Sequence, residues 1–338
     1  MKAVVLEKPG EFRNISVAAP RAPLEGEALV RVHRVGVCGT DLHAFRGTQP
    51  FFNYPRILGH ELGVEVLAVA GKDSKVAPGD HCAVEPGLAC GRCIACRRGK
   101  TNCCVDLKLL GVHIDGGMCE QLIVPVKNLH PAPKLTFEQL AVVEPLCVGR
   151  HAVRRAAPGA GDTVLIIGAG PIGLAVAQSI PREVAALLVM DISDERLAFA
   201  RDKMGIQHCV DGRNDPLAHV TQLLGGELAT VVFDCTGSKQ SMESSINYMA
   251  HGGKLVFVGL FLGDFSFNDP LFQRRETTLL SSRNATAEDF RDVISRMEEG
   301  EINIQPWITH RARADEVLEA FPRWVSGSSG LIKATIEW

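Results

Sequence analysis

The chain has 338 residues, of which 46% are hydrophobic and 22% charged, and its formal net charge is −3. This length predicts about two domains. The lack of a long basic run or a long apolar stretch argues against nucleic-acid binding and against insertion into a membrane. Eleven cysteines without a secretory signal indicate a cytoplasmic protein whose thiols bind metal or stay free.

The first part of the chain, residues 1–150, carries short β-branched runs separated by glycine and proline. Such runs predict an irregular antiparallel β domain. The expected strands cover Met1–Leu6, Glu27–Val35, Gly63–Val69, His81–Val84 and Cys119–Val124.

Residues 151–284 alternate between strand and helix patterns, which predicts a doubly wound parallel sheet. The expected strands are Thr163–Ile167, Ala186–Met190, His208–Val210, Thr230–Asp234, Lys254–Val258 and Thr278–Leu280, with helices over Asp194–Met204 and Asp215–Leu224. Pro181 should end or kink the first crossover helix early, because proline lacks the N–H that a helix interior needs and clashes with the preceding turn. Residues 285–338 are expected to return to the first domain, with a helix over Ala287–Glu299 and a strand over Leu331–Ile336.

A glycine-rich turn follows the first expected parallel strand and has the pattern G-x-G-x-x-G. Gly168 permits the tight turn, Gly170 lets the backbone approach a pyrophosphate, and Gly173 lets the helix pack closely on the strand. The N–H groups at the start of the helix are then open to phosphates. The motif predicts a dinucleotide site whose contacts include Gly168, Gly170, Pro171, Ile172 and Gly173.

An acidic residue, Asp191, ends the next strand of this domain. Its carboxylate can accept a hydrogen bond from a ribose 2′-hydroxyl and would repel a 2′-phosphate, which favours NAD over NADP. A helix-capping role is compatible with this function. Arg196 could stack beside the adenine, although a solvated helix face explains it nearly as well. Further candidate cofactor contacts are Thr236, Val258 and Gly259.

Four cysteines lie within fifteen residues at the spacing C-x2-C-x2-C-x7-C. Short spacers of this kind let one loop surround a tetrahedral metal ion, and structural zinc sites take four thiolates. We therefore predict a structural zinc site formed by Cys90, Cys93, Cys96 and Cys104. A disulfide cluster or unrelated core thiols are the alternatives. Cys103, beside Cys104, leaves the fourth ligand ambiguous by one residue.

A second set of possible metal ligands is dispersed through the first domain: Cys38, His60, Glu61 and Glu144. Together they offer the mixed sulfur, nitrogen and oxygen donors of a zinc site that keeps an open position. Each residue is ordinary alone, and residue types do not establish that the separate segments converge on one ion.

The order of these motifs resembles the zinc-dependent medium-chain alcohol dehydrogenase/reductase superfamily over essentially the whole chain. The resemblance rests on Cys38-Gly-Thr-Asp41, Gly59-His60-Glu61, the four cysteines, Glu144-Pro145 and the glycine turn. Residues 144–155 are similar to the sorbitol and threonine dehydrogenase branch. Residues 49–55, 111–117 and 282–290 are most like L-galactonate (or L-gulonate) 5-dehydrogenases. The resemblance implies a GroES-like catalytic domain joined to a Rossmann domain.

The resemblance also implies roles for individual residues at a catalytic zinc. Cys38, His60 and Glu144 would hold the ion, with Glu61 as an alternating or nearby ligand. Asp41 would hydrogen-bond His60 and fix its tautomer. With the four-cysteine site, this makes two zinc ions per chain.

Three further residues receive roles from the same resemblance. Thr40 would receive the substrate proton, and His43 would pass it to solvent through the cofactor ribose. Val148 would pack behind the nicotinamide ring. The implied protein is a homodimer or homotetramer.

The expected reaction transfers a hydride from the C5 hydroxyl of L-galactonate or L-gulonate to NAD and forms a keto-uronate. Polyols such as sorbitol, and L-threonine, are alternative substrates. A sugar acid brings a carboxylate that must meet a cation or N–H donors. Arg283 is the candidate cation, although an ion pair between domains explains it as well. Phe51, Phe52 and Tyr54 could form a pocket wall, or simply core packing.

Two rival interpretations belong to other classes. A zinc-free member of the superfamily would reduce activated carbonyls or serve a structural role, but the complete set of Cys38, His60 and Glu144 argues against it. A metal-binding structural or regulatory module would instead use the four-cysteine loop as an interaction surface. One zinc ion per chain rather than two would favour either rival.

Overall fold

The computed structural model describes residues 1–50, 52–71, 74–327 and 330–338. The chain divides into two compact units. Unit 1 comprises Met1–Glu144 together with Ala285–Trp338, and unit 2 comprises Pro145–Asn284. The first boundary falls inside helix α3 (Phe137–Ala156), earlier than the expected boundary at residue 150.

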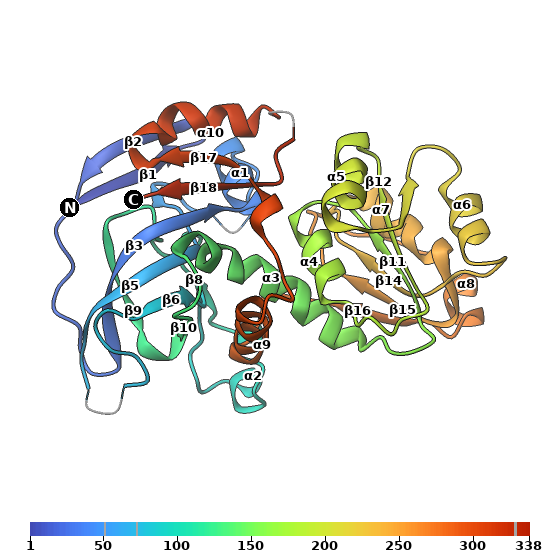
Figure 1. Ribbon diagram of the computed structural model, residues 1–338, viewed down its shortest axis with the longest axis horizontal. Coiled ribbons are helices and arrows are strands. Elements are labelled where there is room, and N and C mark those ends of the chain that lie inside the picture. The colour runs from blue at the N-terminus through green and yellow to red at the C-terminus, as the bar shows by residue number, and fades with distance from the viewer. Residues whose placement is uncertain (51, 72–73, 328–329) are drawn as a thin grey trace. The chain divides into compact units, whose positions relative to one another are not determined.

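The largest sheet of unit 1 combines strands from both ends of the chain (Figure 1). Its order is β10 (Leu129–Pro131), β6 (His81–Val84), β5 (Glu61–Val69), β3 (Glu27–Val37), β18 (Lys333–Glu337) and β17 (Ile308–Arg313), and β9 (Gln121–Pro125) also pairs with β3. β18 runs antiparallel to β3, with Ala334 opposite Val37. The C-terminal strand therefore lies beside the segment that leads into Cys38.

The remaining strands among the described residues of unit 1 form two smaller sheets. One has the order β2 (Glu11–Ser16), β1 (Lys2–Lys8), β4 (Arg56–Ile57), and the other pairs β7 (Gly87–Leu88) with β8 (Lys108–Leu109). The helices of this unit are α1 (Gly39–Arg46), α2 (Ile94–Arg97), α9 (Ala287–Glu298) and α10 (Val317–Val325), together with the first part of α3. Helix α9 confirms the helix predicted over Ala287–Glu299, whereas the sequence pattern did not predict α1, α2 or α10.

Helix α10 illustrates why the sequence pattern did not predict some of the helices. Its buried side chains Val317, Ala320, Phe321 and Trp324 follow a helical period. Pro322 interrupts the helix pattern in the sequence. The Phe321 ring packs against those of Phe12 and Phe45, at centroid distances of 4.9 and 5.5 Å. Contacts with distant aromatic rings, and not local propensity, stabilise this helix.

Unit 2, whose residues are all described, is built on one parallel sheet. Its strands have the order β13 (His208–Asp211), β12 (Ala186–Asp191), β11 (Thr163–Ile167), β14 (Ala229–Asp234), β15 (Met249–Phe257) and β16 (Thr278–Ser281). The order reverses between β11 and β14, which is where sheets of this type bind ligands at the carboxyl ends of their strands. The predicted fold class, a GroES-like β domain with a doubly wound Rossmann domain, is confirmed.

Helices cover both faces of this sheet (Figure 1). They are α4 (Pro171–Ser179), α5 (Asp194–Met204), α6 (Pro216–Leu223), α7 (Lys239–Ser244) and α8 (Asp269–Arg274). α4 ends at Ser179 with Ile180 as its C-cap, so of the two expected effects of Pro181, an early end or a kink, the structure shows the early end.

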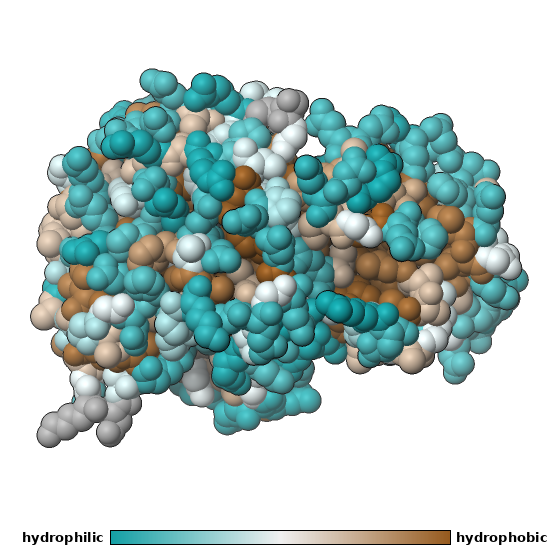
Figure 2. Space-filling view, in the orientation of Figure 1, coloured by the Kyte–Doolittle hydropathy of each residue, from teal (hydrophilic) through white to brown (hydrophobic). Residues whose placement is uncertain are grey.

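Hydrophobic surface gathers on unit 2 in the region of β15 and β16 (Figure 2). Large side chains in the loop after β15 are exposed: Leu260, Leu262, Phe265 and Phe267. We call these four residues the apolar patch. Among the described residues, no helix is long and apolar enough to cross a membrane.

Candidate functional site

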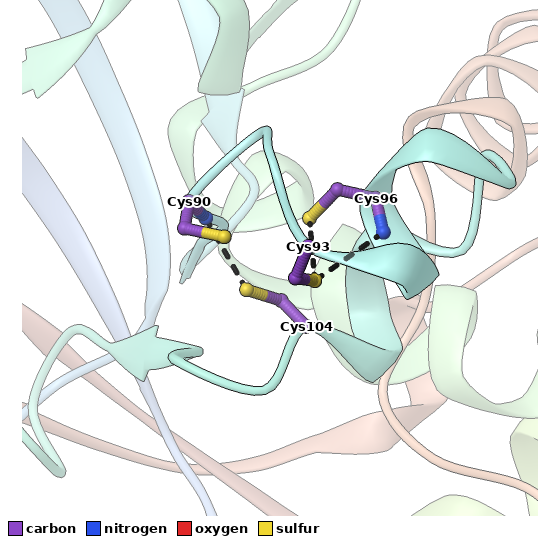
Figure 3. Close-up of side chains that lie close together, drawn as sticks. All are labelled: Cys90, Cys93, Cys96 and Cys104. Atoms are coloured by element: carbon purple, nitrogen blue, oxygen red, sulfur yellow. Dashed lines mark hydrogen bonds between the residues drawn. The ribbon is translucent and has the colours of Figure 1, made fainter.

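The four predicted thiolate ligands converge in the loop that carries α2 (Figure 3). The Sγ atoms of Cys90, Cys93, Cys96 and Cys104 all lie within 4.8 Å of one another. The backbone N–H of Cys90 donates to Cys104 Sγ at 3.2 Å, and that of Cys96 donates to Cys93 Sγ at 3.5 Å. Backbone donors of this kind stabilise thiolates.

The pKa values of these thiols are shifted in opposite directions, as expected for thiols held close together. The N–H groups of Cys96 and Val105 lower the pKa of Cys93 to about 6. Burial and hydrogen bonds among the thiols raise the pKa of Cys96 to about 12. Four sulfurs this close cannot all ionise without a cation, which tetrahedral zinc supplies.

The structure also resolves the two alternatives at this loop. Cys104 is buried within the group, whereas Cys103 is exposed and outside it. All eleven cysteines lie in described parts of the chain, and all are free thiols. The residues present therefore fit a four-thiolate metal site and form no disulfide.

The second set of predicted ligands comes together inside unit 1. Cys38 precedes α1, and His60 and Glu61 lie at the start of β5. One ligand atom from each of these three residues lies within 4.8 Å of the others. Glu144, on α3, falls outside this limit. Burial, together with the nearby Glu61 charge, raises the pKa of Glu144 to about 7 against the opposing charge of His60.

Glycines without room for a side chain bring these segments together. A Cβ atom on Gly36 of β3 would lie 2.2 Å from Glu61 Oε2, and one on Gly63 of β5 would lie 2.1 Å from the carbonyl of Phe137. The two strands thus leave space for the Glu61 carboxylate and for the approach of α3. That approach brings Glu144 toward His60.

The segment 111–117, which contributed to the family resemblance, holds the backbone next to His60. The N–H of Gly116 donates to Ile57 O at 2.8 Å, and that of Gly117 donates to Gly59 O at 2.9 Å. A Cβ atom on Gly116 would lie only 2.2 Å from Gly59 O. Only glycine fits this crossing, so the motif has a packing reason.

A residue that the sequence reading missed, Lys333, is the partner of Glu61. Its Nζ donates to both carboxylate oxygens at 2.7 Å and to the Val37 carbonyl at 3.1 Å. The two side chains are 2% and 0% exposed. The only signal in the sequence was a lysine within an apolar strand pattern, because the partners lie 272 positions apart.

The expected hydrogen bond between Asp41 and His60 is not formed. Asp41 Oδ1 lies 3.7 Å from His60 Nδ1, beyond hydrogen-bond range. Asp41 Oδ2 instead accepts the Cys38 N–H at 2.9 Å, which ties the carboxylate to the start of α1. Burial disfavours protonated His60, but the charges of Asp41 and Cys38 raise the pKa of His60 well above its usual value.

The proposed proton-transfer residues share helix α1. Thr40 is partly buried and His43 is exposed, one helical turn further along. His43 Nδ1 lies 3.1 Å from Thr48 Oγ1. Both candidates therefore belong to the helix that begins at Cys38.

The substrate candidates have mixed outcomes. Phe51 lies outside the described residues. Phe52 and Tyr54 stack edge to face at 4.8 Å and pack against the core of unit 1, as the core-packing alternative expects. Tyr54 also donates its hydroxyl to the Ala44 carbonyl. Arg283 is exposed near the end of unit 2.

The glycine turn of unit 2 has the conformation that its sequence predicts. Gly168 has φ +101°, and a Cβ atom on Gly173 would lie 1.7 Å from Gly168 O, so both positions require glycine. At Gly170 the nearest neighbour of an added Cβ would be Arg196 Nη1, at 3.7 Å. Packing does not explain glycine at position 170, and the space in front of it fits a phosphate group.

Asp191 joins this turn to the end of β12. Its carboxylate accepts the Ala169 N–H at 2.7 Å and the Ser193 N–H at 2.9 Å, and Arg196 Nη1 lies 3.8 Å away. The N-cap of α5 is Ser193, so Asp191 is not the helix cap. Arg196 lies beside both Gly170 and Asp191, which places it at the turn.

The remaining cofactor candidates lie on neighbouring elements of unit 2. The Thr236 methyl group would be 3.2 Å from a Cβ atom on Gly168, so Thr236 borders the turn. Val258 and Gly259 both donate backbone N–H groups to the carbonyl of Asp234, the last residue of β14. Val148 lies on α3, where neighbouring Gly149 packs closely on Ala175 of α4.

Comparison with known proteins identifies the family. The alcohol dehydrogenase GroES-like domain matches residues 24–134, and the zinc-binding dehydrogenase domain matches residues 171–299. L-galactonate-5-dehydrogenase of Escherichia coli (strain K12) is 40% identical over 99% of this chain and 98% of that protein. Sorbitol dehydrogenase of Bacillus subtilis (strain 168) is 34% identical over 77% of this chain and 75% of that protein.

A solved structure agrees with this assignment. A short chain alcohol dehydrogenase from E. coli CFT073, complexed with NADH, superposes with a TM-score of 0.93 at 29% identity, over 100% of this chain and 99% of that one. The chain belongs to the zinc-dependent medium-chain alcohol dehydrogenase/reductase superfamily. It is an enzyme, a zinc-type dehydrogenase that acts on alcohol groups, as the motifs predicted.

Proposed function

We propose that the enzyme oxidises the C5 hydroxyl of L-galactonate or L-gulonate to a keto-uronate and transfers the hydride to NAD. The observation that carries this proposal is the buried convergence of Cys38, His60 and Glu61, with Glu144 nearby, in a chain 40% identical to an L-galactonate-5-dehydrogenase. The identity of the substrate is a proposal, because sorbitol and threonine dehydrogenases are also related to this chain.

Two zinc ions per chain are part of this proposal. Cys90, Cys93, Cys96 and Cys104 would hold the structural ion. Cys38, His60 and Glu144 would hold the catalytic one, with Glu61 beside them. Both oxygens of Glu61 accept hydrogen bonds from Lys333, whereas no lysine hydrogen bond to Glu144 is present among the described residues. Glu144 is therefore the better carboxylate ligand.

The chain's own groups would prepare the alcohol for reaction. A bound zinc ion acts as a Lewis acid on the alcohol oxygen, and a bound NAD accepts the hydride. Thr40, partly buried on α1, would accept the hydroxyl proton, and the exposed His43 would pass it to water through the cofactor ribose. The two roles match the exposure of each side chain.

The dinucleotide would bind at the carboxyl edge of the parallel sheet. Gly168, Gly170 and the first residues of α4, Pro171 and Ile172, would face the pyrophosphate, and Asp191 would face the ribose. Arg196, Thr236, Val258, Gly259 and Val148 are the further proposed contacts. The open space at Gly170 and the carboxylate at the end of β12 support NAD as the cofactor.

The substrate carboxylate needs a cationic partner, and Arg283 remains our candidate. Burying this carboxylate without such a partner would cost more than the roughly 2–7 kcal/mol of an unpaired neutral polar group. Phe52 and Tyr54 pack on the core of unit 1 and so contribute less to this proposal than Arg283 does.

A panel of substrates tests the proposal. We expect kcat/KM with NAD to be higher for L-galactonate or L-gulonate than for sorbitol and L-threonine. Replacement of Arg283 by alanine should raise KM for the sugar acid more than for a neutral polyol. If sorbitol is the better substrate, the enzyme is a polyol dehydrogenase, and a preference for L-threonine would identify a threonine dehydrogenase.

A second copy of the chain is the proposed protein partner. Strand β16 pairs only with β15 in unit 2, and the apolar patch adjoins β15 in sequence. An open edge strand beside exposed apolar side chains favours association. We propose a homodimer or homotetramer in the cytoplasm, and sedimentation equilibrium would measure its mass. A monomer at micromolar concentration would contradict this part of the proposal.

A further inference from the structure

The ribose end of the proposed dinucleotide site is formed by two neighbouring strands. β12 ends at Asp191 and β13 ends at Asp211, and these two residues are partners in the parallel register. The N–H of Gly212 donates to the Asp191 carbonyl at 2.9 Å. The segment that follows β13 therefore lies directly beside the residue proposed to contact the ribose.

That segment places an arginine among carboxylates. Arg213 Nε donates to Asp211 Oδ1 at 2.8 Å, and its Nη2 donates to Asp211 Oδ2 at 3.0 Å and to Asp194 Oδ1 at 2.5 Å. Asp194 is the first residue of α5, three positions after Asp191. One guanidinium is thus shared between two carboxylates from different elements.

This arrangement bears on the choice between NAD and NADP. A 2′-phosphate is usually bound by a guanidinium, which matches its geometry and charge. Arg213 is close to the required place, but its Nε and Nη2 donors already serve Asp211 and Asp194. An entering phosphate would also meet the negative charges of Asp191 and Asp194. Hydrogen bonds from Arg213 lower the pKa of Asp211, so this carboxylate stays ionised at neutral pH.

We infer that Asp194 is a specificity-determining residue that excludes NADP, both by its own charge and by holding Arg213, which is a latent ligand for a 2′-phosphate. The inference rests on the proposed binding of a dinucleotide at Asp191. It adds that Asp191 does not act alone. Removing the Asp194 charge should leave Arg213 partly free to bind a phosphate.

The test measures binding of NADH and NADPH separately from catalysis, by protein fluorescence quenching or calorimetry. The variants are Asp194→Asn, the double variant D194N/R213A, and Asp202→Asn as the matched control. Asp202 also lies on α5 but pairs with Arg201 at 2.9 Å, and removing it changes the net charge equally. Melting curves establish that each variant is folded.

We expect D194N to tighten NADPH binding about tenfold relative to D202N, the order of one charge-assisted hydrogen bond, with little change for NADH. The added R213A change should remove most of that gain and leave only the smaller part that comes from loss of the Asp194 charge. The same comparison in an Asp191→Ser background should give a larger gain, because a second repulsive charge is gone.

Two results would overturn the inference. NADPH affinity of D194N equal to that of D202N would mean that Asp194 does not select the cofactor. A gain of undiminished size in D194N/R213A would mean that Arg213 is not the latent ligand. Either result would leave the proposed function standing, because wild-type protein that binds NADH would still support NAD-dependent oxidation. Wild-type protein that binds neither dinucleotide would overturn both.

Discussion

The Nζ atom of Lys333 lies 2.7 Å from both carboxylate oxygens of Glu61, and the two side chains are almost completely buried. Breaking a buried pair leaves one uncompensated charge, which typically costs ~3–5 kcal/mol. We therefore expect Lys333→Met to lower the free energy of unfolding by about that amount. Urea denaturation of the zinc-loaded protein measures it.

The matched control for Lys333 is Arg311, which pairs with Glu138 at 2.7 Å but is 59% exposed. Exposed pairs contribute about 0–1 kcal/mol, so Arg311→Met should change stability little. An equal decrease in the free energy of unfolding of both variants would show that the buried Glu61–Lys333 pair stabilises the protein no more than the exposed pair does.

The two proposed zinc sites should differ in lability. The four-thiolate site is closed, whereas a catalytic site keeps an exchangeable position. We expect brief treatment with a chelator to remove about one of two zinc ions per chain, together with activity. Metal analysis by atomic emission follows the loss. Simultaneous loss of both ions, or full activity after one is lost, would contradict the assignment.

Cys103 and Cys104 form a natural pair for testing the structural site. Cys104 is buried in the thiol group, and Cys103 is exposed outside it. Cys104→Ser should remove about one zinc per chain and lower Tm, because a structural zinc site needs all four ligands. Cys103→Ser should retain both ions and the wild-type Tm. The reverse pattern would move the fourth ligand to Cys103.

Proton transfer should be separable from metal binding. His43→Ala should keep both zinc ions but slow oxidation near neutral pH by about 10²-fold, the scale of general acid–base catalysis. Cys38→Ser should instead lose the labile ion. Zinc content and the pH profile of kcat distinguish the two effects. Loss of the same metal in both variants would make His43 a ligand or a structural residue.

The ion pair between Arg21 and Glu27 on the surface should make the free energy of unfolding depend on pH. A hydrogen bond from Arg21 and the N–H of Leu24 lower the pKa of Glu27 from 4.5 to about 2 in the folded protein. Its contribution is therefore present above about pH 4.5 and disappears as the pH falls toward 2. Since the pair is largely exposed, Glu27→Gln should cost less than about 1 kcal/mol at pH 7. Denaturation at several pH values should show this difference shrinking below pH 4.5, and a constant difference would contradict the assigned pKa.

The features that the sequence determined by itself are local. The four thiol ligands lie within fifteen residues, so their spacing alone restricts them to one loop. The glycine turn is equally local, because Gly168 and Gly173 restrict the backbone between one strand and the next helix. Strand β11 and helix α5 likewise have the bounds expected from their hydrophobic patterns.

Only the tertiary structure decided which distant residues meet. The pairing of β18 with β3 brings Lys333 to Glu61, and no local pattern encodes a contact across 272 positions. The same holds for Asp41 and His60, whose 3.7 Å separation depends on how α1 is tied to Cys38. Arg213 meets Asp194 because β12 and β13 end side by side. Strand register and helix packing set these distances, and both arise from burial of the whole core, not from any single segment.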